Sequence, residues 1–182
     1  MPSYVALLRG INVGGKNKVP MADLRRMLGE LGHGDVTTHL NSGNALFTSD
    51  RIDDDALAGE IEAAIADGLG LQIATLVRNK AELQTVVDGN PMADYAAAEP
   101  AKFVVYFLSG AADPADLAAI DPALYAPDQC VLSAGGRELY AYCPVSLHES
   151  KLTRQFIEKR LDQQTATARN WNTVVKLLTL LP

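Results

Sequence analysis

Residues 4–31 read YVALLRGINVGGKNKVPMADLRRMLGEL, so an apolar run, a glycine-rich connection and an amphipathic segment follow one another. The apolar run at 4–9 predicts a β-strand. Pro20 suits the first turn of a helix, and the apolar residues of 21–31 recur at the spacing of one helix face. This part of the chain therefore predicts a strand, a loop and a helix, in that order.

The residues that follow predict a hairpin and a second helix. Residues 36–40 alternate in polarity, Ser42-Gly43-Asn44 supplies turn residues, and an apolar run returns at 45–48. A buried stripe and an acidic start predict a helix at 54–68. An apolar run at 71–78 predicts a further strand. Asn79, with Glu82 three residues later, has the pattern of a capping box for a short helix that ends near residue 89.

The second half of the chain repeats this order of elements. We expect a strand at 102–108, a short helix at 114–120, strands near 129–133 and 138–142, and a helix from Ser150. Arg78-Asn79 recurs 91 positions later as Arg169-Asn170, in each half at the end of a strand and the start of a helix. The sequence therefore predicts an α+β fold of two tandem ferredoxin-like β-α-β-β-α-β-α halves, residues 1–90 and 101–182, joined by residues 91–100.

For the ferredoxin-like unit we expect the central strands to be parallel, with their outgoing loops at one edge of the sheet. This expectation places residues 10–18 beside the connection near Asp50. In the second half it places Ser109-Gly110 beside residues 144–150.

Charge and apolar patterning exclude several classes of function. Sixteen Lys and Arg against 22 Asp and Glu give a net charge of −6, which opposes a broad nucleic-acid footprint. The aromatic pattern of RNP1 is absent, and core packing accounts better for the strand aromatics. The start has no signal-peptide pattern, and no apolar run reaches the length of a membrane span. We therefore expect a cytoplasmic protein with no membrane partner, and RNA binding ranks as a third interpretation behind a small ligand and a protein partner.

No pattern of metal ligands or catalytic residues appears. Cys130 and Cys143 form no CxxC pair and are expected to be reduced, buried thiols. His33, His39 and His148 lack the spacing of a metal site, so no metal is predicted. Motifs for serine hydrolases and dinucleotide binding are absent too. The sequence leaves the cofactor, the catalytic residues and the presence of an enzymatic activity open.

The glycine-rich connection is the most informative candidate for a ligand site. Glycine N–H groups and lysines at Gly14, Gly15, Lys16 and Lys18 suit a small anionic or nucleotide-like ligand. The segment is no P-loop, because Asn17 replaces the required Ser or Thr and Pro20 falls where a P-loop is already helical. A glycine-rich turn with solvated lysines explains the same residues. The predicted ligand-contact set is Arg9, Asn12, Gly14, Gly15, Lys16, Lys18, Ser42, Asn44, Lys151, Arg169 and Asn170.

A second interpretation is a non-catalytic module. In this interpretation an exposed sheet edge or helical face mediates self-association, giving a homo-oligomer, or binds a protein partner.

Several segments together resemble a known family. They are YVALLRGINVGGKNKVPMADLR at the start, SGN in the hairpin turn, and later SKLT and TARNWNTV. On these segments the chain is identified as a member of the bacterial family of unknown function DUF1697, with a resemblance along essentially the whole chain. The resemblance implies a duplicated ferredoxin-like fold and no activity. Family members carry a glycine-containing loop before SKL, whereas residues 144–149 contain no glycine.

Overall fold

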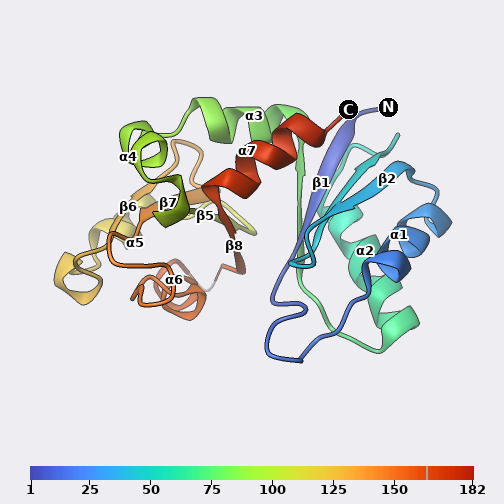
Figure 1. Cartoon of the computed structure of the whole chain (residues 1–182), viewed down its shortest axis with the longest axis horizontal. Helices are drawn as coiled ribbons and strands as arrows, with labels where there is room; N and C mark the ends of the chain where they lie inside the picture. The colour runs from blue at the N-terminus through green and yellow to red at the C-terminus, as the bar shows by residue number, and fades with distance from the viewer. Residues whose placement is uncertain (163) are drawn as a thin grey trace. The chain divides into compact units, whose positions relative to one another are not determined.

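The structure is a computed structural model that describes residues 1–162 and 164–182. The chain divides into two compact units, one formed by 1–84 with 177–182 and the other by 85–176. The predicted connection, residues 91–100, lies inside the second unit by this division. Each unit contains one four-stranded sheet (Figure 1).

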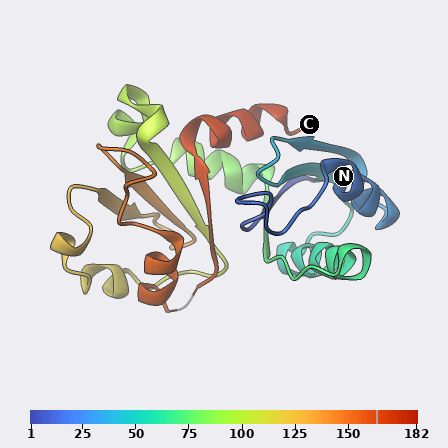
Figure 2. The ribbon, with the colours of Figure 1, turned by 60° about the horizontal axis from the view of Figure 1, so that its bottom comes forward.

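The first unit has the order strand, helix, two strands, helix, strand, helix that the sequence predicts. Its elements are β1 (Ser3–Leu8), α1 (Met21–Glu30), β2 (Gly34–His39), β3 (Asn44–Thr48), α2 (Asp54–Leu69), β4 (Thr75–Asn79) and the start of α3 (Lys80–Asp88). The sheet order is β2-β3-β1-β4. Helices α1 and α2 pack on one face of this sheet over a core that includes Leu24, Phe47 and Ile61 (Figure 2).

The second unit repeats this arrangement with shorter helices. Its elements are α4 (Ala93–Ala98), β5 (Phe103–Leu108), α5 (Pro114–Ala118), β6 (Gln129–Leu132), β7 (Glu138–Tyr142), α6 (Arg154–Arg160), β8 (Ala166–Asn170) and most of α7 (Trp171–Leu180), with short 3-10 turns at Pro100–Lys102 and Pro122–Leu124. The sheet order is β6-β7-β5-β8, which matches the first sheet strand for strand. Two tandem halves of one design are thus confirmed.

The strand directions correct one expectation. β1 runs antiparallel to β3, with Leu7 opposite Asn44 and Ser3 opposite Thr48, and β5 runs antiparallel to β7. The prediction of parallel central strands was therefore wrong. Residues 10–18 follow the end of β1 and lie beside the β2–β3 turn, not beside Asp50. In the second unit, the Ser109 backbone N–H donates to the Thr165 carbonyl at 2.9 Å. Ser109 therefore lies beside Thr165, and not beside residues 144–150 as predicted.

Local capping follows the sequence pattern in the first unit. The Asp53 carboxylate accepts the N–H groups of Asp55 and Ala56 at 3.0 Å, which starts α2. Asn79 and Glu82 bond reciprocally, each side chain accepting the other's backbone N–H at 2.9 Å. The predicted capping box of α3 is therefore confirmed.

Two element boundaries differ from the prediction. Residues 71–74 are not strand, because β4 can pair only as far as β1 extends, and Leu8 pairs with Thr75. Helix α6 starts at Arg154, whereas the sequence predicted a helix from Ser150. The Thr153 hydroxyl caps it by accepting the Phe156 N–H at 3.2 Å.

The chain returns to the first unit at its C-terminal end. The Lys80 ammonium donates to the carbonyl oxygens of Leu181 and Pro182 at 3.0 and 2.9 Å, and the Ser3 hydroxyl also donates to Pro182 at 3.0 Å. Among the residues described, no helix is long and apolar enough to cross a lipid bilayer.

Candidate functional site

The glycine-rich connection folds into a small hairpin. Val13 pairs with Lys16 as an isolated bridge, and the Lys16 N–H donates to the Val13 carbonyl at 3.2 Å. Gly14 and Gly15 have φ of 60° and 75°, which is the left-handed pair of a type I′ turn. The segment is therefore a two-residue hairpin turn, and a P-loop, in which successive N–H groups wrap a phosphate, is a different structure.

Asn12 fixes this hairpin to the sheet. Its side-chain amide donates to the carbonyl oxygens of Val19 and Asn41 at 3.0 and 2.7 Å, while its Oδ1 accepts the Val19 N–H at 3.0 Å. The Asn12 backbone N–H donates to Asn17 at 3.1 Å. Since every one of these polar atoms has a partner inside the protein, Asn12 positions the site and has no donor left for a ligand.

A hollow of about 370 Å³ lies where the hairpin meets the start of α1. We name it the Asn12 hollow; its lining residues are Asn12, Gly15, Lys18, Val19, Pro20, Met21 and Asn41. Pro20 occupies the N-cap position of α1, and no side chain caps the helix there. The N–H groups of the first helical turn have no intrahelical acceptor, so this helix end favours negative charge.

The charge around the Asn12 hollow is positive although the whole chain is acidic. Residues 1–22 contain Arg9, Lys16 and Lys18 and no Asp or Glu. The first carboxylate, Asp23, faces Arg26 with 3.7 Å between oxygen and nitrogen. None of the residues that line the hollow is acidic.

The other predicted contact residues of the first unit lie around the hollow at different depths. Gly14 and Lys16 are exposed at the hairpin turn, and Ser42 is exposed on the β2–β3 turn. Arg9 is half-buried, and its backbone N–H donates to Ala74 at 2.9 Å. Asn44 is fully buried and donates to the His39 carbonyl at 2.8 Å, which stabilises the turn that carries Asn41.

The predicted residues of the second unit are engaged in its own structure. The Lys151 ammonium donates to the Ala126 carbonyl at 3.0 Å. Asn170 donates to the carbonyl oxygens of Pro100, Ala101 and Phe103 at 3.2 to 3.3 Å.

Arg169 is also held within the second unit. It is buried, donates to Thr167 and Ala168 at 2.9 and 2.8 Å, and burial, reinforced by the nearby Arg154 charge, lowers its pKa to about 10. Lys151, Asn170 and Arg169 thus each bond to groups of the second unit.

Sequence reasoning missed two residues that shape these regions. Asp128 is buried and accepts the Ser150 hydroxyl and the Lys151 N–H at 2.9 and 3.0 Å, which holds the segment before α6 out of the helix. Glu138 begins β7 as Asn44 begins β3, and it accepts the Ser133 hydroxyl at 3.1 Å. No local motif marks Asp128, because its partners lie 22 and 23 residues further along the chain, whereas Glu138 bonds across the adjoining β6–β7 turn.

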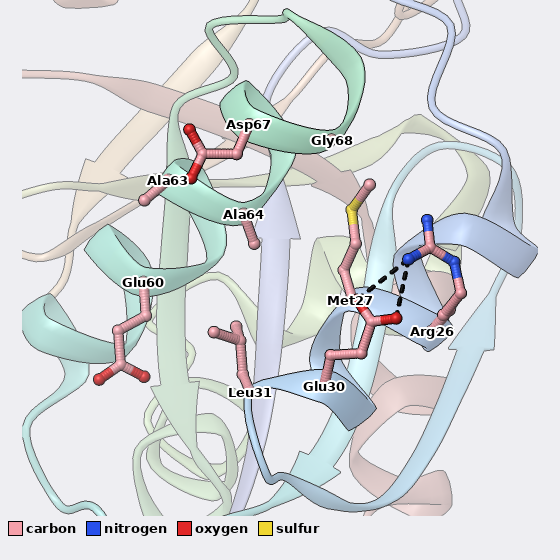
Figure 3. A pocket seen from close by; sticks show the side chains of 9 residues that line it. All are labelled: Arg26, Met27, Glu30, Leu31, Glu60, Ala63, Ala64, Asp67 and Gly68. Atoms are coloured by element: carbon pink, nitrogen blue, oxygen red, sulfur yellow. Dashed lines mark hydrogen bonds and ion pairs between the residues drawn. The ribbon is translucent and has the colours of Figure 1, made fainter.

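A second hollow, of about 490 Å³, lies between α1 and α2 (Figure 3). Its base is apolar, with Met27, Leu31 and Ala64, and its rim carries Glu30, Glu60 and Asp67 against the single guanidinium of Arg26. Arg26 is already paired with Glu30 at 2.9 Å. An anion is therefore disfavoured here, and the Asn12 hollow is the better candidate for an anionic ligand.

The surroundings of the two thiols disfavour ionisation on balance. Burial raises the pKa of Cys130 to about 11 and also raises the pKa of Cys143. A raised thiol pKa disfavours the nucleophilic thiolate. Among the described residues, no cluster of His, Cys, Asp or Glu side chains has the arrangement of a metal site.

The fold and this site define a class of protein: a duplicated α+β chain whose first half carries an exposed glycine hairpin between its first strand and first helix. Residues 1–140 match the family model described as "Protein of unknown function (DUF1697)", and the chain belongs to that family. It is similar in fold to the conserved bacterial protein SP0830 from Streptococcus pneumoniae, with a TM-score of 0.71, 23% identity, and coverage of 98% of this chain and 97% of that one. No curated protein matches the chain significantly.

Proposed function

We propose that this protein binds a small ligand through a phosphate or carboxylate group held at the Asn12 hollow. The observation that supports the proposal is the uncapped start of α1, which adjoins Lys18 at a hollow without a lining carboxylate. Backbone N–H groups at a helix start bind anions together with the helix dipole.

Each residue of the hollow has a separate part in this proposal. The Lys18 ammonium supplies the charge, and the N–H groups of Gly15 and the first turn of α1 supply directional donors. The described structure shows no hydrogen bond that occupies the N–H group of Gly15 or of Lys18. Asn12 keeps the hairpin and the β2–β3 turn in place. Lys16, on the hairpin turn, adds positive potential that attracts the ligand from solution.

The ligand's remaining part contacts Val19, Pro20 and Met21, which give the other wall of the hollow. A volume of about 370 Å³ accommodates a molecule the size of a nucleotide or a sugar phosphate.

A thermal-shift screen with inorganic phosphate, nucleotides, sugar phosphates, coenzymes and citrate tests the proposal. A ligand at about 100 times its Kd stabilises the protein by roughly 2.7 kcal/mol, which moves the Tm by several degrees. We expect Lys18→Ala to weaken binding of the best anion by about tenfold, as loss of one charge-assisted contact does. Lys16→Ala should weaken it less, and added salt should reduce both effects.

Lys159→Ala is the matched control, because Lys159 is an exposed lysine on α6 in the second unit. It should leave the shift unchanged. If no anionic compound shifts the Tm, or if Lys18→Ala and Lys159→Ala behave alike, the proposal is wrong.

A further inference from the structure

The second sheet has a free edge at β6. β6 is the outermost strand in the order β6-β7-β5-β8. The Ser133 N–H donates to the Glu138 carbonyl at 2.8 Å, and the register of β6 on β7 is uninterrupted. Because bonded pairs alternate in an antiparallel ladder, Val131 and Gln129 bond to β7. The N–H and C=O groups of Cys130 and Leu132 therefore point away from the sheet.

β6 lacks the charged residues and bulges that protect many exposed strands from pairing. Natural sheets guard an edge with charged residues, prolines or bulges. The corresponding strand of the first unit, β2, has a register shift between Gly34 and Thr37 and carries the exposed Asp35. β6 has neither feature, since Gln129-Cys130-Val131-Leu132 contains no charged residue.

The sequence around β6 is self-complementary about Val131. Residues 129–133 read Gln-Cys-Val-Leu-Ser, with polar ends and an apolar centre. A second copy placed antiparallel about a two-fold axis at Val131 puts Val131 opposite Val131, Cys130 opposite Leu132 and Gln129 opposite Ser133. Every pair then joins residues of like polarity, and the outward N–H and C=O groups of Cys130 and Leu132 form four interchain hydrogen bonds.

The surroundings of Val131 suit a second copy. Val131 is 38% exposed and borders a hollow of about 370 Å³ that also includes Gln129, Asn90 and Tyr95. Tyr95 is 40% exposed and stacks on Tyr142 with 4.6 Å between ring centres. Val131 of a second copy would pack against the exposed part of Val131 and add apolar contact beside the strand.

We propose that two copies of this chain associate through β6, in antiparallel register about Val131, so that their second sheets form one continuous sheet. This is an isologous interface, in which the same patch serves both copies. A second copy is favoured over an unrelated peptide because the polarity pattern of residues 129–133 is symmetric about its centre.

Analytical ultracentrifugation of the full chain over about a hundredfold range of concentration tests the association, since mass action makes it concentration-dependent. We expect the mass to rise from 19.5 kDa to twice that value. Val131→Lys, which places two like charges opposite each other, should leave a monomer. Val145→Lys is the matched control, because Val145 is 59% exposed in the same unit and lies outside β6. A wild-type chain that stays monomeric throughout overturns the proposal.

Cysteine cross-linking tests the register without relying on Val131→Lys to fold. In a background of Cys130→Ser and Cys143→Ser, Val131→Cys should form an interchain disulfide under mild oxidation. Opposed residues at a non-hydrogen-bonded pair have Cα atoms about 4.5 Å apart, within the range of about 4.4 to 6.8 Å that a disulfide spans.

Gln129→Cys in the same background should not cross-link, because the two copies of residue 129 lie four positions apart along the ladder, about 14 Å. Equal cross-linking of both variants, or of Gln129→Cys alone, overturns the register. A dimer that neither variant captures, and that persists in Val131→Lys, assigns the interface to another surface and overturns the proposal.

Discussion

Asn12 donates its side-chain amide to the carbonyl oxygen of Asn41, with 2.7 Å between nitrogen and oxygen, and so connects the β1–α1 hairpin to the β2–β3 turn. The same amide reaches Val19 at the start of α1. Asn12 has φ of 55°, a left-handed conformation that asparagine tolerates better than most residues. One side chain therefore holds the three segments that surround the hollow.

Replacement of Asn12 should destabilise the protein and disorganise the hollow together. Asn12→Ala removes three hydrogen bonds and places alanine at positive φ, so we expect the free energy of unfolding to fall by about 2 kcal/mol. Urea unfolding measures the change. Asn12→Asp keeps the acceptor for the Val19 N–H but loses both donors, and it should be destabilised as well. If Asn12→Asp is as stable as wild type, the two donated bonds do not hold the hairpin.

Gly43 should tolerate no side chain. It has φ of 89°, and an added Cβ would lie 2.8 Å from the Leu8 Cβ and 2.8 Å from the Ile11 Cδ1. We expect Gly43→Ala to lower the free energy of unfolding by at least about 2 kcal/mol, from strain and overpacking combined. Gly59→Ala is the control: Gly59 lies within α2 with open space around it, so alanine should stabilise by about 0.5 to 1 kcal/mol. Chemical denaturation of both variants makes the comparison, and equal effects would contradict it.

The periodic patterns of the sequence were sufficient for the order of elements, because they report local burial. They were not sufficient for geometry that depends on pairing. The loop at 10–18 was expected beside Asp50, yet β1 and β3 run antiparallel and Leu7 faces Asn44. Strand direction is decided by crossover connections, which no local window contains. The loop at 10–18 lies instead beside the turn at Asn41, and the two segments together line the hollow.

Helix propensity and distant partners explain the other differences. Within the predicted connection, residues 91–100, Ala93–Ala98 form helix α4, since alanine is the best helix former. Ser150 was expected to open a helix, whereas Asp128 binds it from 22 residues away. The sequence alone was sufficient to identify Lys16 and Lys18 as candidate ligand contacts. The absence of a cap on α1 was not, since Pro20 predicts only where a helix starts.

The stability of the α3 capping box should depend on the acceptor oxygen of Glu82 more than on its negative charge. Glu82→Ala removes the acceptor for the Asn79 N–H and should cost about 1 kcal/mol in the free energy of unfolding. Glu82→Gln retains an oxygen at the same position, so it should lose much less. Guanidinium unfolding of both variants, measured at one pH, separates the two expectations. Similar losses in both would assign the effect to the charge of Glu82.

His33 should make the free energy of unfolding depend on pH below about 6.5. The imidazole is 6% exposed, packs on Phe47 with 4.7 Å between ring centres, and neither ring nitrogen has a hydrogen-bond partner among the described residues. Burial lowers the pKa of His33 from 6.5, the nearby Arg51 charge lowers it further, and Glu60 opposes the shift. The folded protein therefore favours the neutral ring.

Below pH 6.5 the unfolded chain binds a proton at His33 that the folded chain resists. The stability is accordingly complete above this pH and decreases as the pH falls towards the lowered value, by at most about 1.4 kcal/mol per pH unit for one proton. His33→Phe, which keeps an aromatic ring against Phe47, should flatten the profile. His148→Asn, at an exposed position, should leave it unchanged. Urea unfolding at steps of pH measures all three profiles, and a wild-type slope that survives in His33→Phe would assign the pH dependence to other groups.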